Sequence, residues 1–246
     1  MESVLVYSVN KAASMFLHKI SNQISKKLEL PYFSMNNDFR EEIKPMTWRK
    51  FIENNKRIGI YGPIRASQGN IYPDNLNNYR IILHLRDPRD VMVSKYYSKA
   101  YNHPKREGGF SISDESREQL RKNGIDDFVI NNPQSKEIKS HYESYIKKLI
   151  GQKNVTFVKY ETMVTDYSTW VRHFLKPFND FYAQPDELYS NLYNEYKNDF
   201  NVSKENIYEH KRQILPGDFK KKLSPETIQF INHQLSDILK FMNYEI

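Results

Sequence analysis

The sequence predicts a single α/β domain in which helices flank a central parallel sheet. Short apolar runs rich in β-branched residues alternate along the chain with longer stretches whose apolar residues follow helical spacing. Strands separated by helices pair in parallel, because the chain must cross over between them. No internal repeat and no obvious linker divides the 246 residues, so we treat residues 1–246 as one domain.

Four segments are predicted to be strands. "VLVYSV" (4–9), "RIILHL" (80–85) and "VTFVKY" (155–160) are apolar and rich in Val and Ile, as buried parallel strands are. "RIGIYG" (57–62) is a weaker candidate, and we expect Gly62-Pro63 to end it.

The intervening segments are predicted to be helical. Residues 13–28 and 134–150 have helical patterns, "RDPRDVMVSKYYSKAY" (86–101) favours a turn and then a helix, and residues 160–198 are mostly helical. The final segment opens with Ser224 as a helix cap followed by Pro225. We expect residues 102–123 to form a long surface loop or lid and residues 200–223 to be irregular.

Composition narrows the class of partner. The formal net charge is +7, which favours an anionic partner such as a nucleic acid or a phosphorylated or sulfated small molecule. There is no cysteine, and Met1-Glu2-Ser3 leads directly into an expected strand without a secretory signal. No run reaches the ~18 apolar residues of a membrane span. We therefore expect a cytoplasmic protein without a membrane span, and the scattered histidines predict no metal site.

The turn "SVNKAAS" joins the first predicted strand to the first predicted helix. Ligands of open parallel sheets bind at the carboxyl ends of the strands, and helix N-termini favour anions. Ala12 and Ala13 allow close approach to the backbone, Ser14 offers a hydroxyl and Lys11 a charge. The alternative is that Ser14 only caps the helix and Lys11 is a solvated turn residue.

A second strand, turn and helix occurs at "LHLRDPRDVMVSKYY". Arg86 follows the strand directly, and Ser94 lies eight residues later on the helix. An arginine in this position suits a bidentate grip on a phosphate. The alternative is a surface ion pair of Arg86 with Asp87 or Asp90.

Four elements together resemble motifs of the cytosolic and carbohydrate sulfotransferases. "NKAASMFL" occupies the place of the family motif P-K-x-G-T-T/S-x-L, and "RDPRDVMVSKY" closely matches the family motif R-[ND]-P-x-D-x-x-x-S-x-Y. "YETM" (160–163) and "RQILPGDFK" (212–220) stand for the two later elements of that family. The resemblance implies a fold like that of P-loop nucleotide hydrolases and a sulfuryl donor, 3′-phosphoadenosine 5′-phosphosulfate (PAPS), with 3′-phosphoadenosine 5′-phosphate (PAP) as product.

The sequence departs from these motifs at several positions. Asn10 replaces the usual proline, Ala13 a glycine and Met15 a hydroxyl residue. Gln213 and Ile214 replace the Lys-Gly of the last element, which weakens the final phosphate contact.

The resemblance assigns roles to the motif residues. Lys11 would neutralise the bridging oxygen as it leaves, and Tyr160 would contact the adenine, with an aromatic residue from 193–200 stacked on it. The 3′-phosphate would be held by Arg86, Ser94 and Arg212, with Gln213 and Ile214 beside them. The 5′-phosphosulfate would be held by the Ser14 hydroxyl and by the backbone N–H groups of Ala12, Ala13, Ser14, Met15 and Phe16.

The catalytic base is harder to assign. The histidine that small-molecule sulfotransferases carry after a middle strand is absent from "IGIYGPIRASQG". We choose Asp38 as the base, with Glu41 and Glu42 as alternatives. His84 and His18 are interpreted as packed core histidines.

The expected reaction transfers a sulfuryl group to a hydroxyl or amine acceptor, with carbohydrates and small alcohols as candidates. Residues 102–123 and 200–223 are expected to cover that acceptor. Three alternatives stay open: a kinase-like phosphotransferase, a nucleic-acid-binding module, and a nucleotide-binding protein of the same fold without turnover. Because the basic residues are dispersed, we expect no nucleic-acid partner, and the sequence leaves the oligomeric state open.

Overall fold

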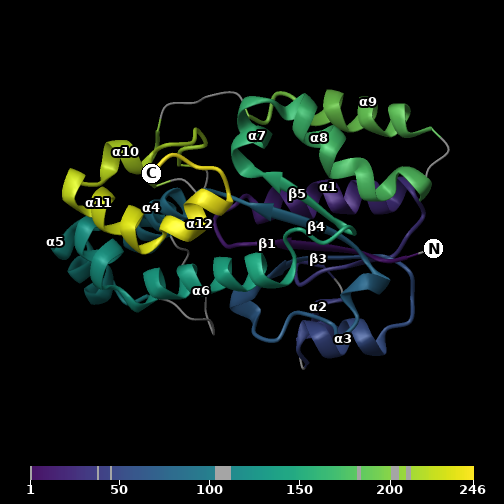
Figure 1. Cartoon of the computed structure of the whole chain (residues 1–246), viewed down its shortest axis with the longest axis horizontal. Helices are drawn as coiled ribbons and strands as arrows, with labels where there is room; N and C mark the ends of the chain where they lie inside the picture. Colours follow the sequence, from purple (N-terminus) through teal and green to yellow (C-terminus); the bar gives the residue numbers. More distant parts are fainter. Residues whose placement is uncertain are drawn as a thin grey trace. The chain divides into compact units, whose positions relative to one another are not determined.

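The computed structural model describes residues 2–37, 39–44, 46–102, 112–181, 184–200, 205–208 and 212–246. Internal contacts divide the chain into two compact units. Unit 1 comprises Met1–Arg86 and Lys147–Phe200, and unit 2 comprises Asp87–Ile146 and Asn201–Ile246. Figure 1 labels most of the helices and strands of both units.

Unit 1 is built on a five-stranded parallel sheet. Its strands, in spatial order, are β2 (Tyr32–Phe33), β3 (Ile60–Arg65), β1 (Val4–Ser8), β4 (Arg80–Leu85) and β5 (Val155–Lys159). Every neighbouring pair is parallel, and β1 lies in the middle between β3 and β4. The predicted α/β class with a central parallel sheet flanked by helices is therefore confirmed.

Helices cover both faces of this sheet (Figure 1). α1 (Ser14–Lys27), α7 (Tyr160–Thr165), α8 (Tyr167–Leu175) and α9 (Pro185–Tyr196) share one hydrophobic core with β1 and β4. α3 (Trp48–Asn54) packs on the opposite face, where Phe51 contacts Phe33 and Tyr61. Short helical segments complete the unit: α2 (Arg40–Ile43) and the 3-10 turns Ala66–Gln68, Leu76–Asn78 and Lys176–Phe181.

The boundaries predicted for β3 were wrong at both ends. The strand begins at Ile60 and continues through Gly62-Pro63 to Arg65. The Gly62-Pro63 dipeptide is accommodated within the strand by an irregularity in the pairing of β1 with β3, whose register shifts between Leu5 and Tyr7. Gly62 has a φ of 141°, and a Cβ there would meet the Val6 carbonyl oxygen at 2.6 Å. Only glycine fits this close approach of two strands.

Among the described residues, unit 2 contains helices and no strand. These are α4 (Pro88–Tyr97), a π-helical turn (Ser98–Asn102), α5 (Asp114–Asn131), α6 (Pro133–Lys148, which ends in unit 1), α10 (Phe219–Lys222), α11 (Pro225–Gln234) and α12 (Ser236–Phe241). The predicted cap is confirmed, because the Ser224 side chain accepts a hydrogen bond from the Thr227 N–H. The last predicted helix is divided into α11 and α12 at Leu235.

The loop predicted for residues 102–123 was wrong over its second half. Residues 103–111 lie outside the described residues, but α5 begins at Asp114. Ser113 caps this helix by accepting from the Ser116 N–H, and Asp114 suits the positive end of the helix dipole. Few side chains of α5 are buried, so its apolar periodicity is weak. The sequence therefore resembled a polar loop.

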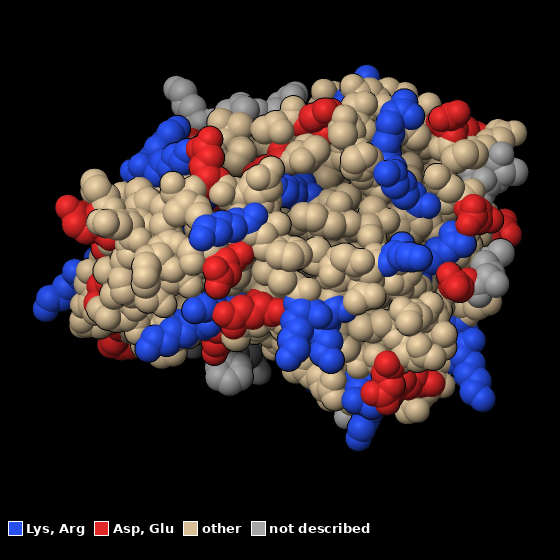
Figure 2. Space-filling model, viewed as in Figure 1, with Lys and Arg blue, Asp and Glu red and all other residues tan. Residues whose placement is uncertain are grey.

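Charges of both signs are interspersed on one face of the molecule. On the face shown in Figure 2, Lys and Arg side chains alternate with Asp and Glu, and neither sign forms a continuous patch. The positive excess of +7 is therefore spread out on that face, in agreement with the dispersed lysines of the sequence. Within the described part of the chain, no helix has the length and apolarity needed to cross a bilayer.

Candidate active site

The turn that follows β1 has an unusual backbone. Lys11 has a φ of 68° and Ala13 a φ of 54°, so two non-glycine residues adopt the left-handed conformation within three positions. Such residues cost roughly 1–3 kcal/mol each and cluster at functional sites. The glycine that is usual at position 13 in the resembling motif would adopt this conformation without that cost.

The first turn of α1 is open to an anion. Ala13 occupies the capping position and has no side chain that could cap, and no acidic residue lies in the first turn. The alternative in which Ser14 caps the helix does not hold, because Ser14 is the first helical residue. Left-handed residues beside a helix N-terminus direct successive N–H groups into a concavity that favours anions.

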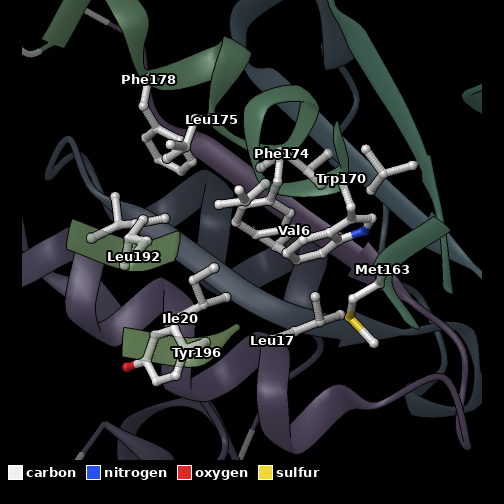
Figure 3. Close-up of a cluster of buried hydrophobic side chains, with 14 of the residues drawn as sticks. Val6, Leu17, Ile20, Met163, Trp170, Phe174, Leu175, Phe178, Leu192 and Tyr196 are labelled. Carbon is white, nitrogen blue, oxygen red and sulfur yellow. The ribbon is translucent and has the colours of Figure 1, made fainter. Parts of the chain in front are cut away.

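Core packing fixes the position of α1 beneath this turn. Leu17, Ile20 and Ile24 are fully buried in the main hydrophobic cluster of unit 1. Figure 3 shows Leu17 and Ile20 in the same cluster as Trp170, Phe174 and Tyr196. The helix that carries the turn is therefore anchored by apolar side chains from α1, α8 and α9.

Phe16 joins α1 to the aromatic side chains of α8 and α9. Its ring lies 5.5 Å from that of Tyr196 and 5.0 Å from that of Phe200, edge to face in both cases. The Phe16 N–H donates to the Ala13 carbonyl at 2.9 Å. The Phe16 amide therefore already has a partner within the turn, whereas the motif resemblance assigned this amide to the 5′-phosphosulfate.

Arg86 brings three motifs together within unit 1. Its Nη1 donates to the Lys11 carbonyl oxygen at 3.0 Å, and its guanidinium carbon lies 4.2 Å from the centre of the Tyr160 ring. The Arg86 side chain is buried, and so is Tyr160 at the start of α7. The arginine after β4 thus supports the turn after β1 while it packs on the first residue after β5.

In unit 2, the acidic residues of the second motif have structural partners. Asp87 forms a buried ion pair with Arg89, at 2.7 Å between Oδ2 and Nη2. Asp90 is 1% exposed and accepts from the Gly217 N–H at 2.8 Å and from the Phe219 N–H at 3.0 Å. Asp90 therefore fastens the last motif, which contains Gly217, to α4. Ser94 lies partly exposed on α4.

Arg212 is buried and paired in unit 2. Its guanidinium hydrogen bonds to the carboxylates of Glu205 and Asp218 and lies 4.1 Å from the centre of the Tyr97 ring. Beside it, Gln213 accepts from the Leu215 N–H through its side chain, and Ile214 is buried. Arg212 therefore has a structural role here, and a 3′-phosphate would have to compete with two carboxylates.

The described residues do not bring the sequence candidates for the general base, Asp38, Glu41 and Glu42, together with the turn after β1. Asp38 lies outside the described residues. Glu41 and Glu42 are exposed on α2, where Glu42 pairs with Arg57 at 3.5 Å. Asn10 has a role that the sequence did not suggest: its Nδ2 donates to Ser67 Oγ at 2.9 Å and joins the turn to the segment after β3.

The two histidines that were interpreted as core residues differ in their surroundings. His84 is fully buried between the rings of Tyr160 and Trp170, and burial lowers its pKa to about 3. Neither ring nitrogen has a partner with hydrogen-bond geometry, although the Ala12 carbonyl lies close enough to oppose part of this fall in pKa. His18 is only partly buried, and its Nδ1 lies 2.9 Å from Tyr32 Oη. His18 is therefore not an apolar core residue.

Two further features lie apart from the motif residues. A cavity of about 550 Å³ in unit 2 lies between Lys99, the first half of α5 and Asn132, and no motif residue lines it. Among the described residues, no three His, Asp or Glu side chains cluster as metal ligands.

The comparisons with known proteins concern the family and the fold. A family model described as "Sulfotransferase domain" matches residues 3–240, which extends over both units. The structure is similar to that of mouse sulfotransferase SULT7A1 complexed with PAP, with a TM-score of 0.57 and 16% identity over 97% of this chain and 84% of that one. It is also similar to retinol dehydratase in complex with retinol and PAP, with a TM-score of 0.50 and 14% identity over 99% of this chain and 82% of that one. No curated protein matches in sequence. The family match covers nearly the whole chain, and the chain therefore belongs to the sulfotransferase family.

Proposed function

We propose that this protein transfers a sulfuryl group from PAPS to a hydroxyl or amine acceptor and releases PAP, and that residues 1–246 act as one sulfotransferase domain. The observation that carries the proposal is the contact between Arg86 and the Lys11 carbonyl, because it ties the two nucleotide motifs to each other. The PAP complexes of the two similar structures support the choice of nucleotide.

The 5′-phosphosulfate is assigned to the turn after β1. The left-handed conformations of Lys11 and Ala13, the absence of an acidic residue from the first turn of α1 and the small side chains of Ala12 and Ala13 suit an anion close to the backbone. The backbone amides of Ala12 to Met15 and the Ser14 hydroxyl would donate to it. We place the Phe16 amide second, because it donates to the Ala13 carbonyl.

The 3′-phosphate and the adenine are assigned from the motifs. Arg86 would grip the phosphate with its planar fork, and Tyr160 would contact the base beside it. The participation of Ser94 and Arg212, with Gln213 and Ile214, rests on the motif spacing alone and stays a prediction.

Lys11 would act on the leaving group. During sulfuryl transfer, negative charge develops on the bridging oxygen as its bond to sulfur breaks, and a cation at that oxygen stabilises the transition state. Asp38 remains the sequence candidate for the base, and hydroxyl acceptors such as carbohydrates or small alcohols remain the candidate substrates. Residues 102–123 and 200–223 are proposed to cover the acceptor.

A nucleotide-binding protein without turnover is the second candidate. Met15 stands where the resembling motif has a hydroxyl residue, and its thioether side chain has no proton to donate to a sulfonate. This candidate predicts PAP binding without sulfuryl transfer. A kinase-like phosphotransferase would instead prefer ATP and require Mg²⁺.

Isothermal titration calorimetry tests the proposal. PAP should bind at least about tenfold more tightly than adenosine 5′-phosphate, which lacks the 3′-phosphate, because a charge-assisted contact contributes about 1.5–3 kcal/mol. Equal affinity for the two nucleotides would remove the main support for PAPS as donor. Turnover is then measured as the release of PAP from PAPS, with and without EDTA.

A further inference from the structure

His18 lies on α1 one helical turn beyond Ser14. Residues four positions apart share one side of a helix, whereas residues two apart lie on nearly opposite sides. Ser14 and His18 therefore share one edge of α1, and Phe16 points to the aromatic residues of α8 and α9 from the other. The hydroxyl assigned to the phosphosulfate and the imidazole thus lie along the same edge.

Two hydroxyl groups hold the His18 ring. Nδ1 lies 2.9 Å from Tyr32 Oη and 3.3 Å from Ser34 Oγ. Ser34 is fully buried, and its Oγ also accepts from the Asn36 N–H at 3.1 Å. No hydrogen bond to Nε2 is found among the described residues. The ring is therefore fixed through Nδ1, and Nε2 remains available for a proton.

The location of the ring suits a reaction at the donor. Tyr32 belongs to β2, and Ser34 is the first residue after the carboxyl end of that strand. The turn that carries Lys11 leaves the carboxyl end of β1 in the same parallel sheet. Reactive groups of open α/β folds gather at this edge of the sheet.

We propose that His18 is the general base of sulfuryl transfer, an inference that rests on the proposed function. Nε2 takes the proton of the acceptor hydroxyl while the acceptor oxygen forms its bond to sulfur. The bond from sulfur to the bridging oxygen breaks, and its electron pair stays on the 5′-phosphate of PAP, where Lys11 balances the charge. The imidazolium then returns its proton to water, which the partial exposure of His18 allows.

The surroundings of the ring suit a base. Burial lowers the pKa of His18, so the ring is neutral and able to accept a proton at neutral pH. The titratable group in contact with it is Tyr32, whose pKa burial raises, so the phenol stays protonated. Lys19, the neighbouring cation on α1, pairs with Asp199. Hydroxyl groups can rotate to accept, so Tyr32 and Ser34 can receive the Nδ1–H of an imidazolium.

The other histidine at this edge does not suit the role. His84 is fully buried between two aromatic rings, and its lowered pKa of about 3 leaves it a weak base. An acceptor would also have to reach ring nitrogens that are both inaccessible to solvent.

The experiment compares two acceptors of different acidity with PAPS as donor. Water needs a base to become a nucleophile, whereas p-nitrophenol is largely ionised at about pH 8 and needs none. His18→Asn keeps a polar group near Tyr32 but removes the base. We expect it to slow transfer to water by about 10²–10⁴-fold and transfer to p-nitrophenol by less than about tenfold, with the affinity for PAP unchanged. A merely structural role would slow both reactions equally, and that result overturns the proposal.

Further variants separate the possible failures. If His18→Asn does not bind PAP, His18→Gln replaces it, and the pH profile of the wild type is measured as well. Transfer to water by the wild type should decline at acidic pH as His18 becomes protonated. A profile that stays flat from neutral pH down to the acid limit of the folded protein overturns the proposal. Loss of transfer in Asp38→Asn but not in His18→Asn assigns the base to Asp38. A wild type that binds PAP without turnover defeats this inference, and one that binds no PAP defeats the proposed function itself.

Discussion

The Nη1 atom of Arg86 donates to the carbonyl oxygen of Lys11 at 3.0 Å, so one arginine supports the backbone of the turn that carries the candidate catalytic lysine. The same guanidinium packs on the ring of Tyr160. Residues that are far apart in the chain therefore depend on one buried cation. A change at Arg86 should affect both the phosphate contact and the shape of the turn.

Arg86→Lys should weaken PAP binding by at least about tenfold in calorimetry, because lysine keeps the charge but cannot reach the carbonyl and a phosphate with one planar fork. Arg57→Lys is the matched control, since Arg57 also packs on an aromatic ring, that of Phe33, but is exposed. Normal PAP affinity in a folded Arg86→Lys protein would reassign this residue to structural support alone.

Lys11→Ala should reduce kcat by about 10²–10³-fold with little change in the affinity for PAP. The cation acts on charge that develops mainly in the transition state, and PAP lacks the sulfonate. Steady-state release of PAP from PAPS measures the first quantity and calorimetry the second. Lys19→Ala, at an exposed lysine on α1, should leave both unchanged. An unaltered kcat in Lys11→Ala would falsify the catalytic role.

Asp90→Asn should lower the free energy of unfolding by about 1–3 kcal/mol. The buried carboxylate accepts from two backbone N–H groups, and an amide can present only one oxygen to them. Urea titration followed by circular dichroism measures the change. Asp237→Asn in the first turn of α12 is the control and should have little effect. If the two variants are equally stable, the contact of Asp90 with residues 217–219 contributes little.

Gly62→Ala should destabilise the fold by more than about 2 kcal/mol, since the new Cβ would meet the Val6 carbonyl oxygen at 2.6 Å in a backbone conformation that alanine avoids. Gly151→Ala is the matched control. It also has a positive φ, of 85°, but nothing lies within 4 Å of its Cβ position. The difference between the two unfolding free energies isolates the steric clash. Equal values would mean that β1 and β3 can move apart without loss.

His84→Phe should flatten the dependence of stability on pH. Burial lowers the pKa of His84 from 6.5 to about 3, so between these values the unfolded chain binds a proton that the folded chain does not. The wild type therefore loses stability on acidification, by about 2 kcal/mol between about pH 7 and pH 5 from this residue.

The variant should lack that loss. Urea titrations at both pH values measure the difference, with His173→Phe on the exposed side of α8 as the control. If the stability of His84→Phe depends on pH in the same way as that of the wild type, His84 does not cause the loss of stability on acidification.

Much of the fold follows from local patterns, but its irregular parts do not. β4 and β5 could be predicted because they are short, largely apolar runs that contain Ile or Val, and Ser224 because a cap followed by proline is a local signal. β3 could not be bounded, because the backbone freedom of Gly62 allows the sheet to accept a dipeptide that elsewhere ends a strand. β2 has only two residues, too few for a pattern.

The site shows the same division. The motifs of the sequence pointed to Lys11 and Arg86. However, Arg86 contacts the backbone carbonyl of Lys11, and a pattern of side-chain types gives no signal of such a contact. His18 was interpreted as a core residue because its partners, Tyr32 and Ser34, belong to an edge of the sheet that could not be predicted. For Arg212 the nearby Glu205 and Asp218 were available as a signal of ion pairing.

The central position of β1 has a consequence for how the chain folds. This strand leaves the ribosome before both of its neighbours in the sheet, β3 and β4, which lie far along the chain. Long-range pairing of this kind slows folding, because a long loop must close before any contact forms. The apolar segment "VLVYSV" therefore stays unpaired until translation has passed Arg65 and lacks its second neighbour until translation has passed Leu85. We expect it to be the segment that a chaperone binds on the nascent protein.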